Sequence, residues 1–288
     1  MDQAQSLRRL AAQRRLRQTP APPLRTLAVT SGKGGVGKTN IVVNLALAMA
    51  KLGRKVLVID ADLGLANVDV VLGLNPAYTI GDVIQGDKTI EEVLVEGPGG
   101  IQILPAASGV AELSNLSSDE KLLILQEFDT FNTLADVVII DTAAGISDTV
   151  LYFNMAAQDR LVVATGEPTS LTDAYALIKV LYTQHQERRF KLVVNNVKDE
   201  AEAKSVFRKL SMAADHFLGG LSIDYLGFIP SDPAVSRSVI QQRALLEAFP
   251  ASAAARGVEA LAKAFLNSPL EQGGGNIKFF WRRLVDMS

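Results

Sequence analysis

The sequence predicts an α/β fold, a doubly wound and mostly parallel sheet with helices on both faces. Two observations predict it. Short runs rich in Val and Ile are apolar throughout, which is typical of strands buried on both faces of a parallel sheet. Longer stretches of helical composition separate most of these runs, as in successive βαβ units. With 288 residues, 48% of them hydrophobic, the chain can bury such a core.

The elements follow one another in a regular order. Seven strands are expected, at residues 25–30, 55–60, 101–104, 136–141, 160–165, 190–195 and 223–229. Helices are expected at residues 38–52, 117–131, 147–157, 170–184, 200–217 and 250–266. No internal repeat interrupts this alternation, so the strands and helices between residues 24 and 268 are expected to form one domain.

Segments of different composition flank this domain. Residues 1–18 have a helical composition, and the proline-rich linker 19–23 separates them from the domain at 24–268. A glycine-rich linker, 269–276, contains three consecutive glycines and leads to a final segment, 277–288. The sequence therefore predicts an N-terminal helix and a C-terminal helix, each tethered to one α/β domain.

Composition excludes several functions. The chain has no cysteine and only two His, which argues against disulfides, iron–sulfur clusters and histidine-rich metal sites. No apolar run is long enough to span a bilayer, and the Arg-rich start lacks a secretory signal, so we expect a cytoplasmic protein. Residues 1–25 hold six Arg and one Asp, and the rest of the chain holds 23 basic and 30 acidic residues. We expect no direct binding of nucleic acid to this acidic body.

A phosphate-binding loop lies between the first strand and the first helix of the domain. Its glycines allow backbone N–H groups to surround phosphates, and the helix that starts near Asn40 adds a favourable dipole. Lys38 is expected to reach the β- and γ-phosphates of ATP, and the Thr39 hydroxyl to bind Mg²⁺. The loop reads Gly32, Lys33, Gly34, Gly35, Val36, Gly37, Lys38 and Thr39.

The early lysine of this loop carries a family resemblance. Lys33 has no place in a generic phosphate-binding loop, but the sequence from Lys33 to Thr39 resembles the deviant Walker A loop of the MinD/ParA family. The resemblance implies an ATPase in which the early lysine crosses a dimer interface to the nucleotide of the partner. Carried onto this chain, the crossing residue is Lys33, and two copies would form a homodimer with ATP.

Carboxylates after two apolar strands fit the same family. Asp60 and Asp62 follow the second strand in a segment that is similar to the family's first switch, and Asp141 ends a Walker B-like strand. Phosphoryl transfer needs a carboxylate near the attacking water and another near Mg²⁺. The resemblance implies that Asp62 orients the water, that Asp60 helps to order water and metal, and that Asp141 binds Mg²⁺. Gly145 is expected to approach the γ-phosphate.

The adenine pocket is expected where two later strands end. Ligands of doubly wound sheets bind at the carboxyl edge, and Asn195, Pro230 and Asp232 lie at strand ends. In the family, an Asn side chain and the backbone after a Pro hold adenine, so the resemblance gives these roles to Asn195 and to the segment after Pro230. The family usually has Arg after that Asn, but here Asn196 follows it.

Both ends of the chain resemble one branch of the family. Residues 2–8 resemble the N-terminal segment of the flagellar-number regulators FlhG/FleN. Two segments of the body, residues 62–69 and 167–179, also look like that branch. In the branch, this N-terminal segment stimulates an FlhF-type GTPase, and its Gln inserts near the partner's nucleotide. The resemblance assigns partner binding to Asp2, Gln3, Leu7 and Arg8, with Gln3 in the inserted position.

The last segment has the pattern of an amphipathic helix. Apolar residues recur at helical spacing, and Lys278, Arg282 and Arg283 lie on the opposite face. It resembles the membrane-targeting tail of this family, so we expect it to bind the inner face of the cytoplasmic membrane in the ATP state. One short tail binds weakly, whereas two tails on a dimer act together. The apolar face consists of Ile277, Phe280, Trp281, Leu284 and Val285.

Taken together, these features predict an ATP-driven switch that regulates the number or placement of flagella. A flagellar transcription regulator or a flagellar switch component is a further candidate partner. Two alternatives stay open at this point: a division-site or DNA-partition ATPase of the same family, and a scaffold that binds ATP without cycling. The presence of Asp62 argues against the scaffold.

Overall fold

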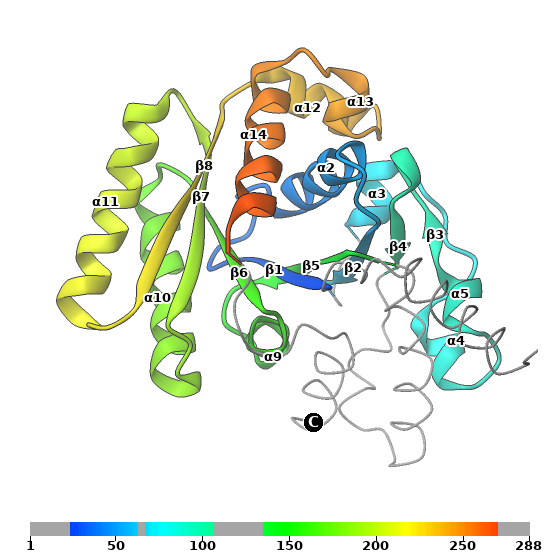
Figure 1. Cartoon of the computed structure of the whole chain (residues 1–288), viewed down its shortest axis with the longest axis horizontal. Helices are drawn as coiled ribbons and strands as arrows, with labels where there is room; N and C mark the ends of the chain where they lie inside the picture. The colour runs from blue at the N-terminus through cyan, green and yellow to red at the C-terminus, as the bar shows by residue number, and fades with distance from the viewer. Residues whose placement is uncertain (1–23, 63–66, 106–134, 270–288) are drawn as a thin grey trace, which may run out of the picture.

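The computed structural model describes residues 24–62, 67–105 and 135–269. Its centre is an eight-stranded sheet with the strand order β3-β4-β2-β5-β1-β6-β7-β8 (Figure 1). The described strands are β1 (Arg25–Ser31), β2 (Val56–Ala61), β3 (Val95–Glu96), β4 (Gln102–Leu104), β5 (Val137–Ala144), β6 (Asp159–Ala164), β7 (Arg189–Val197) and β8 (Ser222–Pro230).

Every neighbouring pair of strands is parallel except β3 and β4. This arrangement confirms the doubly wound, mostly parallel fold and all seven expected strands. The eighth strand, β3, was not predicted, because two residues are too few to carry a periodic signal.

Helices cover both faces of the sheet. The longer ones are α2 (Lys38–Lys51), α9 (Asp148–Ala156), α10 (Pro168–His185), α11 (Glu200–Phe217), α12 (Pro233–Ile240) and α14 (Ala253–Asn267). The shorter ones are α3 (Val68–Leu72), α4 (Ile80–Ile84), α5 (Ile90–Val93), α13 (Leu245–Ala248) and the 3-10 turn η1 (Pro98–Gly100). Five expected helices correspond to α2, α9, α10, α11 and α14, and the expected helix at 117–131 lies outside the described residues.

The core is divided by the sheet. Helices α2 and α14 pack on one face, where Leu45 and Phe265 meet strand residues such as Val29. Helices α9, α10 and α11 pack on the other, where Leu177 meets Val194. Figure 1 shows α2 and α14 above the sheet and α9 below it. Burial on both faces explains why the central strands are apolar throughout.

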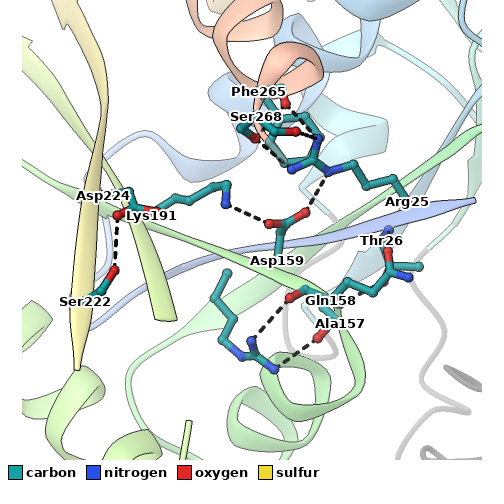
Figure 2. Close-up of polar contacts among 11 residues, drawn as sticks. Arg25, Thr26, Ala157, Gln158, Asp159, Lys191, Ser222, Asp224, Phe265 and Ser268 are labelled. Atoms are coloured by element: carbon teal, nitrogen blue, oxygen red, sulfur yellow. Dashed lines mark hydrogen bonds and ion pairs between the residues drawn. The ribbon is translucent and has the colours of Figure 1, made fainter. Parts of the chain in front are cut away.

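This topology gathers the functional residues at one edge. Because β1, β2, β5, β6, β7 and β8 run parallel, their carboxyl ends lie side by side. The last residues of these strands and the loops that follow them carry the candidate residues, as expected for ligand sites of open α/β sheets. The opposite, amino edge holds the first residue of β1 and the end of α14, which Figure 2 shows.

Candidate nucleotide site

The phosphate-binding loop joins β1 directly to α2. Gly37 caps the helix with φ 92°, and Gly35 has φ 76°, left-handed conformations that glycine adopts without strain. No side chain caps α2, so its first N–H groups are not taken by a cap. Gly32 is required for a different reason: a Cβ there would lie 2.0 Å from the carbonyl oxygen of Asp173 on α10. The loop thus offers backbone donors at a helix N-terminus, which favours phosphate.

A cavity of about 420 Å³ opens beside this loop. It brings together the phosphate-binding loop and the ends of β7 and β8, which are far apart in the sequence. Its lining includes three of the expected adenine-pocket residues, Asn195, Pro230 and Asp232. Asn196 and Ser231, which directly follow Asn195 and Pro230 in the sequence, also line the cavity. The sequence did not single out the other lining residues for this pocket: Thr165, Glu167, Pro233, Val235 and Ser236.

Two of these residues also support the cavity wall. The Asn195 side chain donates from Nδ2 to the carbonyl oxygen of Val36, at 2.8 Å. Asp232 caps α12, accepting from the N–H of Ala234 at 2.9 Å and from the N–H of Ala254 at 3.2 Å. These backbone hydrogen bonds, chiefly that of Ala234, lower the pKa of Asp232. Its carboxylate is therefore used mainly to hold α12 and α14 at the cavity rim.

One of the residues expected to hold Mg²⁺, Asp141, is a buried carboxylate. Asp141 is 1% exposed, and neither carboxylate oxygen has a well-formed hydrogen bond among the described residues, although the Thr39 hydroxyl lies close enough to stabilise the charge. Burial, helped by the nearby charge of Asp60 and opposed by Thr39 and Lys38, raises the pKa of Asp141 to about 7. A buried carboxylate that lacks a well-formed hydrogen bond and lies next to a hydroxyl fits a hard cation that prefers oxygen ligands.

Lys38 completes this cluster of charges. It is 9% exposed, and burial lowers its pKa while the carboxylates of Asp141 and Asp62 raise it. No group of three or more acidic, His or Cys side chains suited to a metal occurs in the described part of the chain. The fit to Mg²⁺ therefore rests on Asp141 and Thr39 together with phosphate oxygens and water, the usual pattern for magnesium on a nucleotide.

The two aspartates at the end of β2, Asp60 within the strand and Asp62 directly after it, differ in their surroundings. Asp60 is buried, and its carboxylate accepts three backbone N–H groups, from Asp62, Asn67 and Val68, each at 3.1 Å. Burial raises the pKa of Asp60 to about 6 despite these bonds. Asp60 therefore anchors the start of α3, a contact that the sequence did not reveal. Asp62 is partly exposed, and its Oδ2 accepts a hydrogen bond from Asn67 Nδ2 at 3.1 Å.

Lys33 lies at the cavity mouth and is bound within its own chain. Its ammonium is 2.6 Å from Glu167 Oε2 and 3.2 Å from the Thr169 hydroxyl. The side chains of Lys33 and Glu167 are 39% and 65% exposed, so water screens their attraction. On the other side of the loop, Gly145 has φ 99° and donates its N–H to Ser31 O at 2.9 Å. This bond brings the expected second switch next to the phosphate-binding loop.

The remaining predicted residues cannot be compared with the structure. The partner-binding residues Asp2, Gln3, Leu7 and Arg8 lie outside the described residues, as do the membrane-binding residues Ile277, Phe280, Trp281, Leu284 and Val285. Within the part of the chain that the structure covers, no helix is both long and apolar enough to span a bilayer.

The fold and the site together define a P-loop nucleotide-binding protein. Residues 27–245 match the CobQ/CobB/MinD/ParA nucleotide binding domain, and the chain belongs to this family. It is an ATPase, with ATP as its nucleotide.

Several known proteins are similar over most of their length. The Antiactivator FleN of Pseudomonas aeruginosa is 48% identical over 264 residues, which cover 91% of this chain and 94% of FleN. The Flagellum site-determining protein YlxH of Helicobacter pylori is 33% identical, covering 90% of this chain and 89% of YlxH. Among solved structures, the MinC:MinD cell division protein complex of Aquifex aeolicus contains a chain that is 29% identical, with a TM-score of 0.65, covering 87% of this chain and 100% of that one.

Proposed function

We propose that this protein is an ATP-driven switch that regulates the number or placement of flagella. The observation that carries the proposal is its 48% identity to FleN across nearly the whole of both chains. YlxH, whose name also refers to the flagellum, is 33% identical. Septum site-determining MinD proteins match at 34% identity or less, over shorter parts of this chain, so the flagellar branch is favoured over a role in division.

The proposed reaction is ATP hydrolysis by an in-line water. Backbone N–H groups of the loop from Gly32 to Thr39 and the Lys38 ammonium bind the phosphates. Bound Mg²⁺ would neutralise phosphate charge, with Thr39 and Asp141 holding it and Asp60 ordering the neighbouring segment. Asp62 orients the water, and its hydrogen bond with Asn67 supports that role. Asn195, Pro230 and the backbone near Asp232 form the adenine end of the cavity.

The switch is proposed to work through dimerisation. In the ATP dimer, Lys33 leaves Glu167 and contacts the nucleotide of the partner. Its partial exposure and its position at the cavity mouth support this step. Two amphipathic tails then hold the dimer on the inner face of the cytoplasmic membrane, and hydrolysis returns monomers to the cytoplasm. The tail residues are Ile277, Phe280, Trp281, Leu284 and Val285.

Dimerisation is tested by substituting the lysine. Lys33→Ala is expected to remain monomeric with ATP and Mg²⁺ in analytical sedimentation, while the unmodified protein forms a dimer. A stable ATP dimer of Lys33→Ala would remove Lys33 from the interface.

The flagellar function is tested through its proposed partner. Residues 1–18 are proposed to stimulate the GTPase activity of an FlhF-type protein, with Gln3 placed near its nucleotide and Asp2, Leu7 and Arg8 in the contact. A peptide of residues 1–18 is expected to increase GTP hydrolysis, and the Gln3→Ala peptide is expected to have no effect. A wild-type peptide without effect, together with capture of a division inhibitor by the full chain, would favour the division-site alternative.

A further inference from the structure

One glutamine joins the end of α12 to the end of α3. Gln242 lies two residues beyond α12, and its Nε2 donates to the carbonyl oxygen of Val70 in α3, at 3.1 Å. It also lies against Gly73, the residue that ends α3: a Cβ at Gly73 would be 3.3 Å from the Cβ of Gln242. The C-terminal end of α3 is therefore contacted by a side chain that lies 172 positions further along the sequence.

Gln242 has a backbone conformation that glycine adopts more easily. Its φ is 51°, and it is one of three non-glycine residues with positive φ in the described part of the chain. The N–H groups of Gln242 and Arg243 donate to the carbonyl oxygens of Val239 and Ser238, at 2.9 and 3.1 Å. Helices that end in this way usually have glycine at the left-handed position, because a side chain is disfavoured there. A side chain that is kept at such a position and makes a specific contact indicates a role for the side chain itself.

The segment that carries Gln242 is held in place at both ends. Before it, α12 begins at Asp232, and the first residues of this helix line the nucleotide cavity. After it, the N–H of Leu246 in α13 donates to Asn44 Oδ1 at 3.0 Å, in a buried hydrogen bond. Asn44 lies on α2, the helix that begins at the phosphate-binding loop, and Figure 1 shows α12 and α13 on the same face of the sheet as α2. Gln242 is therefore fixed relative to the cavity and to the phosphate-binding loop.

Helix α3, in contrast, depends on its neighbours for its position. It has five residues, of which Val68 and Val71 are buried. A helix of this length is not stable by itself. At its first end, Asn67 donates from Nδ2 to Asp62 Oδ2 at 3.1 Å, and at its last end it receives the hydrogen bond of Gln242. A shift of α3 would therefore move Asn67 and release the Asp62 carboxylate.

We propose that Gln242 is a positioning residue for ATP hydrolysis, which fixes α3 against the end of α12 so that Asn67 holds the Asp62 carboxylate toward the attacking water. The proposal rests on the proposed function, in which Asp62 orients that water. Gln242 is not among the described residues that line the cavity, so it acts through α3. Gln242 is exposed, and so is Val70, at 60%. Their hydrogen bond therefore contributes little to folding, and its loss leaves a folded protein.

Gln242→Gly separates positioning from stability. It removes the side chain and relieves the left-handed backbone, so the melting temperature is expected to be unchanged or higher. The kcat for ATP with Mg²⁺ is expected to fall about five-fold, the effect of one lost hydrogen bond, and KM is expected to stay within about two-fold. A residue with a structural role alone would not lower kcat in a protein of equal or higher stability.

Two matched variants complete the comparison. Gln242→Glu keeps the size of the side chain and the left-handed backbone, but a carboxylate cannot donate to Val70 O, so kcat is expected to fall at least about five-fold. Gln186 is also exposed and also left-handed, with φ 59°, at the end of α10. Gln186→Gly is expected to keep kcat within about two-fold, because it relieves the same backbone conformation away from the site. Wild-type kcat in either Gln242 variant would overturn the proposal, as would an equal loss in Gln186→Gly.

The route through α3 is tested by combining two substitutions. Gln242→Gly added to Asn67→Ala is expected to lower kcat no further than Asn67→Ala alone, because the contact that Gln242 supports is already absent. Losses that multiply would show that Gln242 does not act through Asn67 and would overturn the proposal. Normal turnover of Asp62→Ala would refute the role of Asp62 in the proposed function, and this proposal with it. The other outcomes leave the role of Asp62 intact.

Discussion

The Asn195 side chain donates a hydrogen bond from Nδ2 to the carbonyl oxygen of Val36, at 2.8 Å, in the phosphate-binding loop. The same nitrogen would lie only 2.5 Å from a Cβ at residue 37. Asn195 therefore links the proposed adenine end of the cavity to the loop that binds phosphate, and it explains why residue 37 is glycine. An Asn that only contacted the base would leave the loop unaffected.

This relationship predicts how Asn195→Ala changes binding. Loss of one hydrogen bond is worth about 1 kcal/mol, so affinity is expected to fall about five-fold for both ATP and inorganic tripolyphosphate. Titration calorimetry with the two ligands distinguishes the roles, since tripolyphosphate has no base. Ser236→Ala, in the wall of the same cavity, is the control. Loss for ATP alone would mean that Asn195 acts only on adenine.

The ion pair between Lys33 and Glu167 predicts a change in dimerisation. Glu167→Gln removes the ion pair that holds Lys33 in the monomer and leaves its contact with the Thr169 hydroxyl. The ATP dimer is therefore expected to form at about two- to three-fold lower protein concentration, because an exposed ion pair contributes little free energy. Analytical sedimentation in ATP measures this. Glu200→Gln, which breaks a similar exposed pair with Lys204, is the control. A Glu167→Gln protein that stayed monomeric would show that Glu167 also supports Lys33 in the dimer.

The hydrogen bond between Asn67 and Asp62 predicts a loss of turnover without a loss of binding. Asn67→Ala leaves the Asp62 carboxylate free to rotate, and turnover is expected to fall about ten-fold because orientation is lost. Asp62→Ala is expected to lower it about 10²-fold or more and to keep the ATP dimer intact. Single-turnover phosphate release and nucleotide affinity are measured together. Val70→Ala, an exposed change on α3, the helix that begins directly after Asn67, is the control. Normal turnover in Asn67→Ala would remove this positioning role.

Much of the fold could be predicted because its signals are local. The central strands are continuous apolar runs, because both of their faces are buried. The edge strand β8 is mostly half-buried but keeps enough apolar residues to be predicted. The short helices α4 and α5 were missed, although each starts with a capping box, Thr79 with Asp82 and Thr89 with Glu92. Four or five residues give no helical periodicity, so only these caps could have indicated them.

The candidate site was predictable only as far as its residues are contiguous. The loop from Gly32 to Thr39 is one motif with its own strand and helix. The contacts of Lys33 with Glu167 and of Asn195 with Val36 span 134 and 159 positions. They depend on strand order and on side-chain rotamers, which no spacing in the sequence reveals. The sequence predicted that Asp60 lies near the metal. It could not predict the three hydrogen bonds that backbone N–H groups donate to its carboxylate, because they depend on the path of the chain after β2.

The pKa shifts of the buried carboxyls predict how stability depends on pH. Burial raises the pKa of Asp60 to about 6 and that of Asp141 to about 7, from 3.8. Both groups then bind protons more tightly in the folded state. Without nucleotide, their stabilising effect is complete below pH of about 4 and is lost as the pH rises through about 6 to 7. The protein alone is therefore expected to become less stable across this range.

Asp141→Asn tests this dependence and the metal site together. At pH of about 8, the free energy of unfolding without nucleotide is expected to rise by about 1–3 kcal/mol, because a buried charge is removed. The loss of stability between pH of about 5 and 8 should become smaller, and Mg²⁺ should no longer add to stabilisation by ATP. Thermal unfolding measures the free energy of unfolding, its dependence on pH and the effect of Mg²⁺. Asp87→Asn, a substitution of an exposed residue, is the control. An unchanged pH dependence with an intact Mg²⁺ effect would remove Asp141 from both roles.

The single tryptophan predicts a direct signal for membrane binding. Trp281 belongs to the proposed apolar face of the tail, and no other tryptophan occurs in the chain. Insertion moves the indole from water to an apolar interface, so its fluorescence is expected to shift to the blue when ATP and anionic vesicles are both present. ADP should give little shift, since one tail binds weakly and two tails on a dimer bind together.

Phe280→Glu should abolish the shift by placing a charge in the buried face. Lys278→Gln removes one screened attraction and should reduce it only in part. A shift of equal size in ATP and ADP would leave the tail as the anchor and refute control by nucleotide, whereas no shift under any condition would refute insertion of this face.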